Sequence, residues 1–325
     1  MNCYLIQQNK VAEKISIGDQ ASKHYLYGKD QFIEKSFQRL EGAAQEVISK
    51  VVDHGPKSVS MAENNVVQEF FLFQFTRTPR QASYANEALT KGMRELFRNH
   101  PEFGKKVDSL EVEYEQPYEQ MFNMTIDLQG VLSDLKLGVI VAPDSTDFLL
   151  GQHPTILTNP YFYKRNWPAE GYGFGCKGIA LFLPVDKKHA LVLFDRDRLA
   201  FRQFGRQCLA TSADVDKLNL LQFFYTSNCV YYQNEFDRNY LKQLALETDS
   251  FRKSAIAHVI PVAVGNRQGL ALNSNAPDFP PEFGFFGFKR KFFGEPFGPT
   301  QWDLTRESIR VVLLRQERER EKEKS

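Results

Sequence analysis

Three polar residues on apolar, helix-like segments carry the clearest chemical signal in this chain. Gln74 and Arg77 are three positions apart, so they share one face of a helix that Pro79 must end or kink. A cation is favourable at a helix C-terminus, and Glu41 on a separate apolar segment is the natural anionic partner of Arg77. These residues predict either an ion pair that fastens two helices, or a pocket in which Arg77 holds an anionic group such as phosphate.

A second candidate site lies near the C-terminus, where aromatic and basic residues alternate. Stacking on aromatic rings combined with neutralisation of the backbone is the chemistry of single-stranded nucleic-acid binding, and an exposed aromatic patch would also suit a protein partner. The alternative is a loop that buries its Phe side chains, which a chain with 28 Phe favours. The residues concerned are Phe285, Phe286, Phe288, Lys289, Arg290, Lys291, Phe292 and Phe293.

The remaining motifs point to no known reaction. Gly173–Gly178 matches G-x-G-x-x-G, but a strand-like run follows it where the dinucleotide fingerprint requires a helix. The sequence contains no P-loop, H-E-x-x-H, G-x-S-x-G or kinase signature. The four Cys and six His show no metal-ligand spacing, so they predict no metal centre. The cofactor is left undetermined, and a divalent metal stays an option.

Composition narrows the class of protein. Apolar residues make up 42% of the chain and charged residues 25%, with a formal net charge of +1, so no strong global attraction for nucleic acid or anionic membranes is expected. The N-terminus lacks the features of a signal peptide, and no apolar run reaches the roughly 18 residues of a membrane span. These features predict a cytoplasmic protein with reduced cysteines and no membrane partner.

The first part of the chain predicts a β-hairpin followed by helices. Cys3–Gln7 and Val11–Ile17 alternate like paired strands. A helix is expected over about residues 30–52 with Asp30 as its N-cap, and a second one begins with the capping-box pair Ser60 and Glu63. A further helix is expected over about 106–135. One apolar stripe marks the first helix: Ile33, Phe37, Leu40, Ala44, Val47 and Val51.

The later part predicts strands, then helices, then a Phe-rich segment. Strand-like runs cover 137–142, 148–150, 155–157, 179–183 and 190–194, the last two as a pair. Helices are expected over about 213–227, capped by Ser212, and over about 236–248, with another from Asp303. This order predicts an α+β fold with a mixed, largely antiparallel sheet and flanking helices. Three parts are expected: 1–135, 136–270 and 271–325.

Several of these stretches together resemble the bacterial family named domain of unknown function 4238. They are Leu40-Glu41, Phe73–Pro79, Asp147–Leu157 with its turn Gly151–Pro154, Leu183-Pro184 before Lys188–Leu191, and Asn219 followed by Val230-Tyr231. The resemblance covers about residues 1–235. It departs from the family pattern twice, because the family's upstream His-containing segment is missing and Gln152 stands where the family has Asp. If that Asp serves the family as a metal ligand or a general base, Gln152 cannot replace it, because an amide carries no charge and does not titrate.

The resemblance adds Gln152, His153 and Asn219 to the candidate site of Glu41, Gln74 and Arg77. The leading hypothesis is an enzyme, or a protein derived from one, that acts on a phosphate-containing substrate such as nucleic acid. The family type, and no residue, adds antiphage defence as a setting. The alternative is a non-catalytic module that docks a protein partner or a second copy through the Phe-rich segment and the C-terminal helix. The enzyme hypothesis requires a polar pocket at Arg77, whereas the docking hypothesis requires an exposed aromatic patch at residues 283–293.

Overall fold

A five-stranded sheet forms the centre of the molecule. The computed structural model describes residues 1–15, 32–164, 173–202, 206–233, 236–264, 267–274, 277, 279, 282–289 and 305–311. The strand order is β5 (Ile156–Thr158), β6 (Ala180–Pro184), β7 (His189–Phe194), β3 (Lys136–Val141) and β9 (Cys208–Leu209). All neighbours are antiparallel except β3 and β9. The predicted α+β class with a mixed, largely antiparallel sheet is therefore confirmed, as is the β6–β7 pair.

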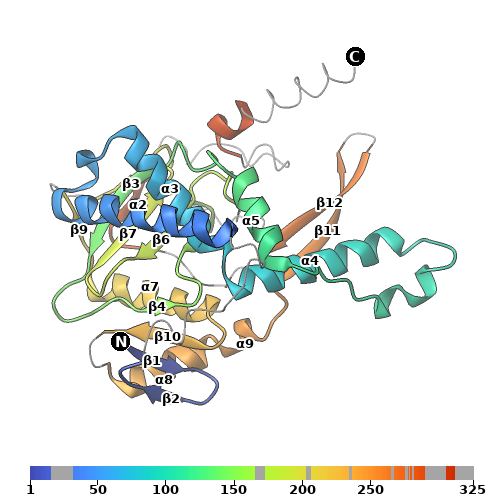
Figure 1. Ribbon diagram of the computed structural model, residues 1–325, viewed down its shortest axis with the longest axis horizontal. Helices are drawn as coiled ribbons and strands as arrows, with labels where there is room; N and C mark the ends of the chain where they lie inside the picture. The colour runs from blue at the N-terminus through green and yellow to red at the C-terminus, as the bar shows by residue number, and fades with distance from the viewer. Residues whose placement is uncertain are drawn as a thin grey trace.

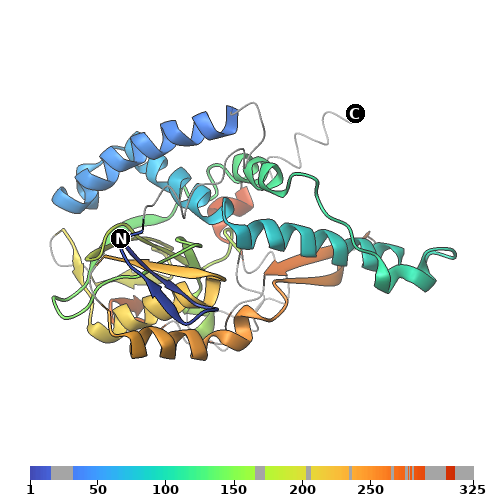
Figure 2. The ribbon, with the colours of Figure 1, turned by 60° about the horizontal axis from the view of Figure 1, so that its bottom comes forward.

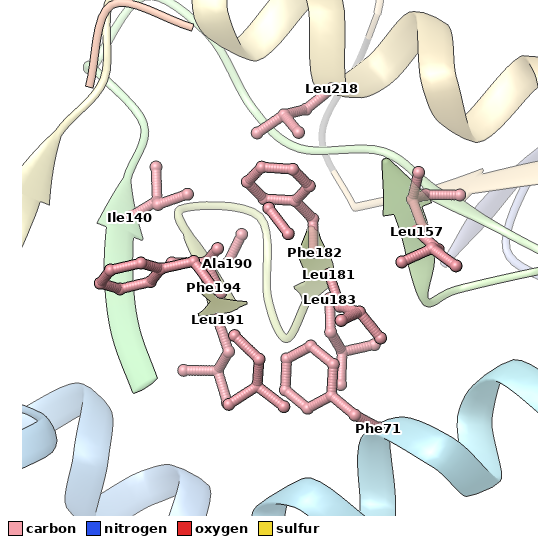
Figure 3. Close-up of a cluster of buried hydrophobic side chains, with 14 of the residues drawn as sticks. Phe71, Ile140, Leu157, Leu181, Phe182, Leu183, Ala190, Leu191, Phe194 and Leu218 are labelled. Atoms are coloured by element: carbon pink, nitrogen blue, oxygen red, sulfur yellow. The ribbon is translucent and has the colours of Figure 1, made fainter. Parts of the chain in front are cut away.

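Helices cover both faces of this sheet. Helices α2 (Phe32–His54) and α3 (Met61–Thr76) lie over one face, and α7 (Ser212–Tyr225) lies over the other (Figure 1). Figure 3 shows Phe71 of α3 and Leu218 of α7 on opposite sides of the labelled strand residues. Side chains from both layers belong to one buried apolar cluster. This core fixes the position of the α3 C-terminus, where the candidate site lies.

The local signals for α2 and α3 are confirmed. The predicted stripe of α2 is buried at every position except Leu40, which is partly buried. Ser60 and Glu63 form the capping box of α3, and a short 3-10 helix, η1 (Pro56–Ser58), precedes it. Arg77 is the C-cap residue of α3, and Thr78 is the N-cap of α4 (Pro79–Phe97). The proline therefore ends one helix and begins the next, since a proline at the first helical position removes no needed hydrogen bond.

A second sheet brings the N-terminal hairpin to the middle of the chain. Its order is β2 (Lys10–Ala12), β1 (Asn2–Leu5), β10 (Cys229–Tyr232) and β4 (Leu150–Gly151), with all pairs antiparallel. The predicted hairpin is confirmed as β1 and β2, and the last two residues of its second predicted strand, 16 and 17, lie outside the described residues. One face packs against helix α8 (Arg238–Glu247), where Tyr4, Val230 and Leu241 are buried together. The division of the chain at residues 135 and 270 stays a prediction.

An arm built on α4 extends away from the sheets (Figure 2). The hairpin of β11 (Ala257–Val264) and β12 (Arg267–Ser274) lies beside it, and the Lys91 ammonium donates to the Ala257 carbonyl at 2.7 Å. The helix expected over 106–135 is wrong: residues 104–109 form the 3-10 helix η2 (Gly104–Ser109), and α5 begins only at Pro117 (Pro117–Asp127). Pro117 occupies the first turn of α5 and cannot donate a backbone hydrogen bond, so it marks a start rather than an interior.

The remaining elements complete the surface around the sheet. The short helices α6 (Pro160–Lys164) and α9 (Asp249–Arg252) follow β5 and α8 along the chain. The N-cap of α7 is Thr211 and not the predicted Ser212, because the Thr211 hydroxyl accepts from the Asp214 N–H at 3.2 Å. None of the helices in the described residues combines the length and apolar character that crossing a membrane requires.

The Phe-rich segment contributes a strand and part of the core. Strand β13 (Phe286–Phe288) pairs with β8 (Leu199–Phe201). Phe285 and Phe286 are buried against Phe182, with ring centroids 6.0 and 6.2 Å from it. Phe288 and Lys289 are half-buried. Arg290, Lys291, Phe292, Phe293 and the predicted cap Asp30 lie outside the described residues, as does the predicted C-terminal helix apart from residues 307–311, which are helical.

Candidate functional site

A cleft of about 1180 Å³ opens between α2, the C-terminal end of α3 and the turn that follows β4. Four of the six predicted site residues line it: Glu41, Gln74, Arg77 and Gln152. These residues come from three separate parts of the chain, so the fold brings together what the sequence holds far apart. The other two, His153 and Asn219, lie buried behind the turn rather than in the cleft wall.

Helix α2 presents a polar stripe to the cleft beside its apolar one. Glu34, Gln38, Glu41 and Gln45 follow each other at alternating steps of four and three residues, and all four line the cleft. The apolar stripe of the same helix packs on the core. The amphipathic pattern of α2 therefore fixes which side chains reach the cleft.

Arg77 and Glu41 form an ion pair across the cleft wall. Arg77 Nη1 lies 2.5 Å from Glu41 Oε1, and the guanidinium carbon lies 4.5 Å from the centre of the Phe73 ring. The two side chains are 35% and 41% exposed, and ion pairs of this exposure contribute only about 0–1 kcal/mol to stability. Within the described residues, Nη1 is the one guanidinium nitrogen that has a hydrogen-bond partner. The ion pair with Glu41 thus orients the Arg77 side chain. The other two guanidinium nitrogens have no partner among the described residues.

Gln74 offers a second polar group beside Arg77. Gln74 is 6% exposed, and it lines the cleft. Its amide makes no hydrogen bond to any residue in the described part of the chain. The amide is not among the fully buried groups that lack a partner in the described residues, so it reaches the cleft and can hydrogen-bond to a molecule that enters it.

Two amides of α7 hold the turn that closes the cleft. Asn219 Oδ1 accepts from the Leu149 N–H at 2.8 Å, and its Nδ2 donates to the Asp147 carbonyl at 3.0 Å. Gln222, one helical turn later, accepts from the Gly151 N–H at 2.8 Å and donates to the Pro154 carbonyl at 3.0 Å. Asn219 therefore positions the backbone of this turn. Gln222, which the sequence analysis did not single out, does the same.

The close approach of this turn to α7 explains why residue 151 is a glycine. A Cβ atom on Gly151 would lie 2.1 Å from Thr226 Oγ1 and 2.9 Å from Gln222 Oε1. Both distances are far below a van der Waals contact, so only glycine fits against α7 here. Gln152 then projects into the cleft, while its Oε1 accepts from the Asn228 N–H at 3.1 Å.

His153 fastens the turn to the start of α4. Its ring is 1% exposed, its Nδ1 lies 2.7 Å from Thr78 Oγ1, and the Phe75 ring packs edge-on against it. Burial, with a smaller effect of the Arg80 charge, lowers the pKa of His153 to about 3. The imidazole is thus neutral near neutral pH, and it is not one of the residues that line the cleft.

The charges of the cleft are mainly negative. Glu34, Glu41, Asp53 and Asp186 line it, and among the described lining residues Arg77 is the basic side chain that opposes them. A nucleic-acid backbone requires several cations along its path. A ligand with a single anionic group at Arg77, and with hydroxyl or amino groups elsewhere, matches this arrangement better. Across the described ranges, no three or more His, Cys, Asp or Glu are grouped to hold a metal ion.

A second arginine, Arg306, holds the C-terminal segment and is outside the cleft. It is 3% exposed, and its Nε lies 2.8 Å from Asp134 Oδ2. Its other nitrogens donate to the carbonyls of Val131, Phe174 and Cys176. No sequence pattern marked this residue, because its partners lie more than 120 positions away.

The sequence matches a family model over residues 1–236. The chain belongs to the family of proteins of unknown function DUF4238. All the residues that line the cleft of this DUF4238 protein fall within the matched span. A search of curated proteins and of solved structures gave no match to the chain. The cleft is therefore part of the family domain, whereas the described Phe-rich residues and the Arg306 segment follow it in the chain.

Proposed function

We propose that the cleft binds a small phosphate-containing molecule and that this DUF4238 protein is an enzyme, or derives from one, acting on it. The observation that carries the proposal is the meeting of Arg77, Glu41, Gln74 and Gln152 in one cleft of about 1180 Å³. A volume of this size accommodates a small-molecule ligand.

Each of these residues has a distinct role in the proposal. Arg77 holds the anionic group with the guanidinium nitrogens that Glu41 does not use, since a guanidinium suits two parallel hydrogen bonds to phosphate. Glu41 orients Arg77, and Gln74 donates from its amide beside it. The carboxylates of Glu34 and Asp186 suit hydroxyl or amino groups on the remainder of the molecule.

Polynucleotides and protein partners are less well supported as ligands. The cleft offers one basic side chain among its described lining residues, and a phosphate backbone would face four carboxylates. The docking hypothesis required exposed aromatic residues, but Phe283, Phe285 and Phe286 are 2–5% exposed. A role in antiphage defence stays a prediction from the family resemblance alone.

A thermal-shift panel tests the proposal. Inorganic phosphate, nucleotides, sugar phosphates and short DNA and RNA oligonucleotides are added to the wild-type protein, to Arg77→Ala and to Arg98→Ala as an exposed control. We expect at least one small phosphate compound to raise the Tm of the wild type and of Arg98→Ala, but not of Arg77→Ala. No shift with any small phosphate, or an equal shift in Arg77→Ala, contradicts the proposal.

Incubation of a stabilising compound with the protein then tests for reaction. Mass spectrometry detects its conversion in the presence of Mg²⁺, Mn²⁺ or EDTA. Conversion that is lost in Arg77→Ala supports an enzyme, and binding without conversion supports a protein derived from one. If labelled single-stranded DNA or RNA is degraded in an Arg77-dependent way instead, the substrate is a polynucleotide and not a small molecule.

A further inference from the structure

The outer end of the arm carries an apolar ring and basic side chains that face solvent. The arm extends from the body of the molecule as α4 and turns back through η2 (Figure 2). Phe103 is 57% exposed, although large apolar side chains usually pack in a core. Lys105 and Lys106 follow it in η2; both are exposed, and neither forms an ion pair with any described residue. We call Phe103, Lys105 and Lys106 the arm tip.

The chain that returns along α4 carries a stripe of carboxylates. Three exposed residues, Glu111, Glu113 and Glu115, alternate with half-buried residues, as the period of two in an extended chain requires. The sequence has no Lys, Arg or His from residue 107 to residue 135. Within the described ranges, none of the three glutamates forms an ion pair. We call these three residues the glutamate stripe.

Hydrogen bonds to α4 hold the returning chain in place. Thr90 Oγ1 accepts from the Val112 N–H at 3.0 Å and lies 2.6 Å from the Val112 carbonyl oxygen. Asn86 Oδ1 accepts from the Tyr114 N–H at 3.0 Å. The glutamate stripe therefore has a fixed position beside residues 86–90 of α4, about two helical turns from the end of that helix at Phe97.

The opposite charges of these two places make the arm complementary to a second copy of itself. When two arms lie side by side and antiparallel about a two-fold axis, the tip of each can meet the stripe of the other, and the rotation that forms one contact also forms the second. A parallel arrangement would bring the lysines of the two tips together, so the charges favour the antiparallel one. Residues 79–85 of α4 lie between the stripe and the sheets, so the two bodies stay apart.

We propose that two copies of this chain associate through their arms, with the arm tip of each copy against the glutamate stripe of the other. The half-buried Val112 and Tyr114 alternate with the glutamates and offer an apolar surface to Phe103. Because the contact is confined to the arms, we expect a dimer that forms in the micromolar concentration range. The inference does not depend on the ligand of the cleft, since no residue of the tip or the stripe lines it.

Sedimentation velocity of the full chain tests the association. Wild type is measured over a series that reaches about 100 μM, and we expect a monomer at the low end and a dimer at the high end. Lys105→Glu/Lys106→Glu and Glu111→Lys/Glu113→Lys should each stay monomeric, because each variant places like charges at both contacts. An equimolar mixture of these two variants should form the dimer again, since both contacts then join opposite charges.

Two substitutions of exposed apolar residues compare the arm with the rest of the surface. Phe103→Ser removes the apolar part of the tip and should weaken the association at least about tenfold. Met61→Ser changes an 83% exposed residue at the start of α3 and should dimerise as the wild type does. Added salt should weaken the wild-type dimer, because it screens the attraction between exposed charges.

Four results would overturn the inference. They are a wild type that stays monomeric over the whole series, a dimer that both charge-reversed variants also form, a mixture of those variants that stays monomeric, and equal weakening by Phe103→Ser and Met61→Ser. Circular dichroism of each variant before measurement confirms that folded proteins are compared. A charge-reversed variant that is not folded is replaced by its two single substitutions, to which the same criteria apply.

Discussion

Two arginine–carboxylate pairs join distant segments of this protein, and they differ in almost every physical respect. Arg306 is 3% exposed, and all three of its nitrogens have partners among Asp134 and three backbone carbonyls. Arg77 is 35% exposed, and its contact with Glu41 uses one nitrogen. Every nitrogen of Arg306 is thus satisfied, whereas Arg77 lines a cleft and two of its guanidinium nitrogens have no partner among the described residues. We infer that Arg306 serves the fold and that Arg77 serves a ligand.

The largest effect on stability is expected from Arg306→Ala. Removing this side chain leaves the Asp134 carboxylate and three carbonyls without their partner, so the free energy of unfolding should fall by about 3–5 kcal/mol. Urea denaturation followed by circular dichroism measures the change. Arg196→Ala, an exposed residue of the neighbouring surface, is the control and should change it by less than about 0.5 kcal/mol. Equal effects of the two variants would remove the distinction drawn here.

A smaller effect is expected from acid, through His153. Its folded pKa of about 3 lies below the unfolded value of 6.5, so the unfolded chain binds more protons below pH 6.5. The stabilisation is complete above pH 6.5 and is lost as the pH falls from 6.5 towards 3. At pH 5 the loss from this group is about 2 kcal/mol, at about 1.4 kcal/mol per pH unit.

Comparison of His153→Gln with wild type isolates this contribution. Unfolding free energies are measured by urea denaturation at pH 7.5 and pH 5, and the wild type should lose about 2 kcal/mol more than the variant over this interval. His100→Gln, at an exposed position, is the control and should follow the wild type. If His153→Gln and wild type lose the same amount, His153 is not the neutral, buried fastener of the turn.

The smallest effect on stability is expected from Arg77→Ala. Both side chains of its ion pair with Glu41 are more than a third exposed, so the free energy of unfolding should fall by no more than about 1 kcal/mol. Glu41→Gln should behave in the same way. Both are measured by urea denaturation beside Arg306→Ala. A loss for Arg77→Ala that approaches the loss for Arg306→Ala would make Arg77 a structural residue.

Local signals in the sequence predicted most of what positions the cleft. The apolar stripe of α2, the capping box at Ser60 and the break at Pro79 depend on neighbours within a few positions, and all three are confirmed. The pairing of Arg77 with Glu41 was also predicted, because an arginine on an apolar helix face requires an anionic partner and Glu41 lies on another apolar helix. The resemblance to the family added Gln152 to the candidate site, and the structure places it in the same cleft wall.

Features that depend on distant partners could not be predicted in this way. Asn219 and His153 were expected in the site, but hydrogen bonds to backbone and to Thr78 bury them behind the turn. Gln222 holds the same turn through other backbone groups, those of Gly151 and Pro154. The sequence signal that could have indicated Gln222 is a second amide three residues after Asn219 on the same apolar helix. The burial of Phe285 and Phe286 follows from the pairing of β13 with β8, across 85 positions, which no local pattern shows.

The affinity of the cleft for its ligand tests the central claim most directly. The small phosphate compound that most stabilises the wild-type protein is titrated by calorimetry into wild type, Arg77→Lys and Arg77→Ala. Loss of a charge-assisted hydrogen bond weakens binding by about 1.5–3 kcal/mol, so Arg77→Ala should bind at least about tenfold more weakly, with Arg77→Lys in between. Binding of Arg77→Ala with the affinity of the wild type would contradict the assignment of Arg77 to a ligand.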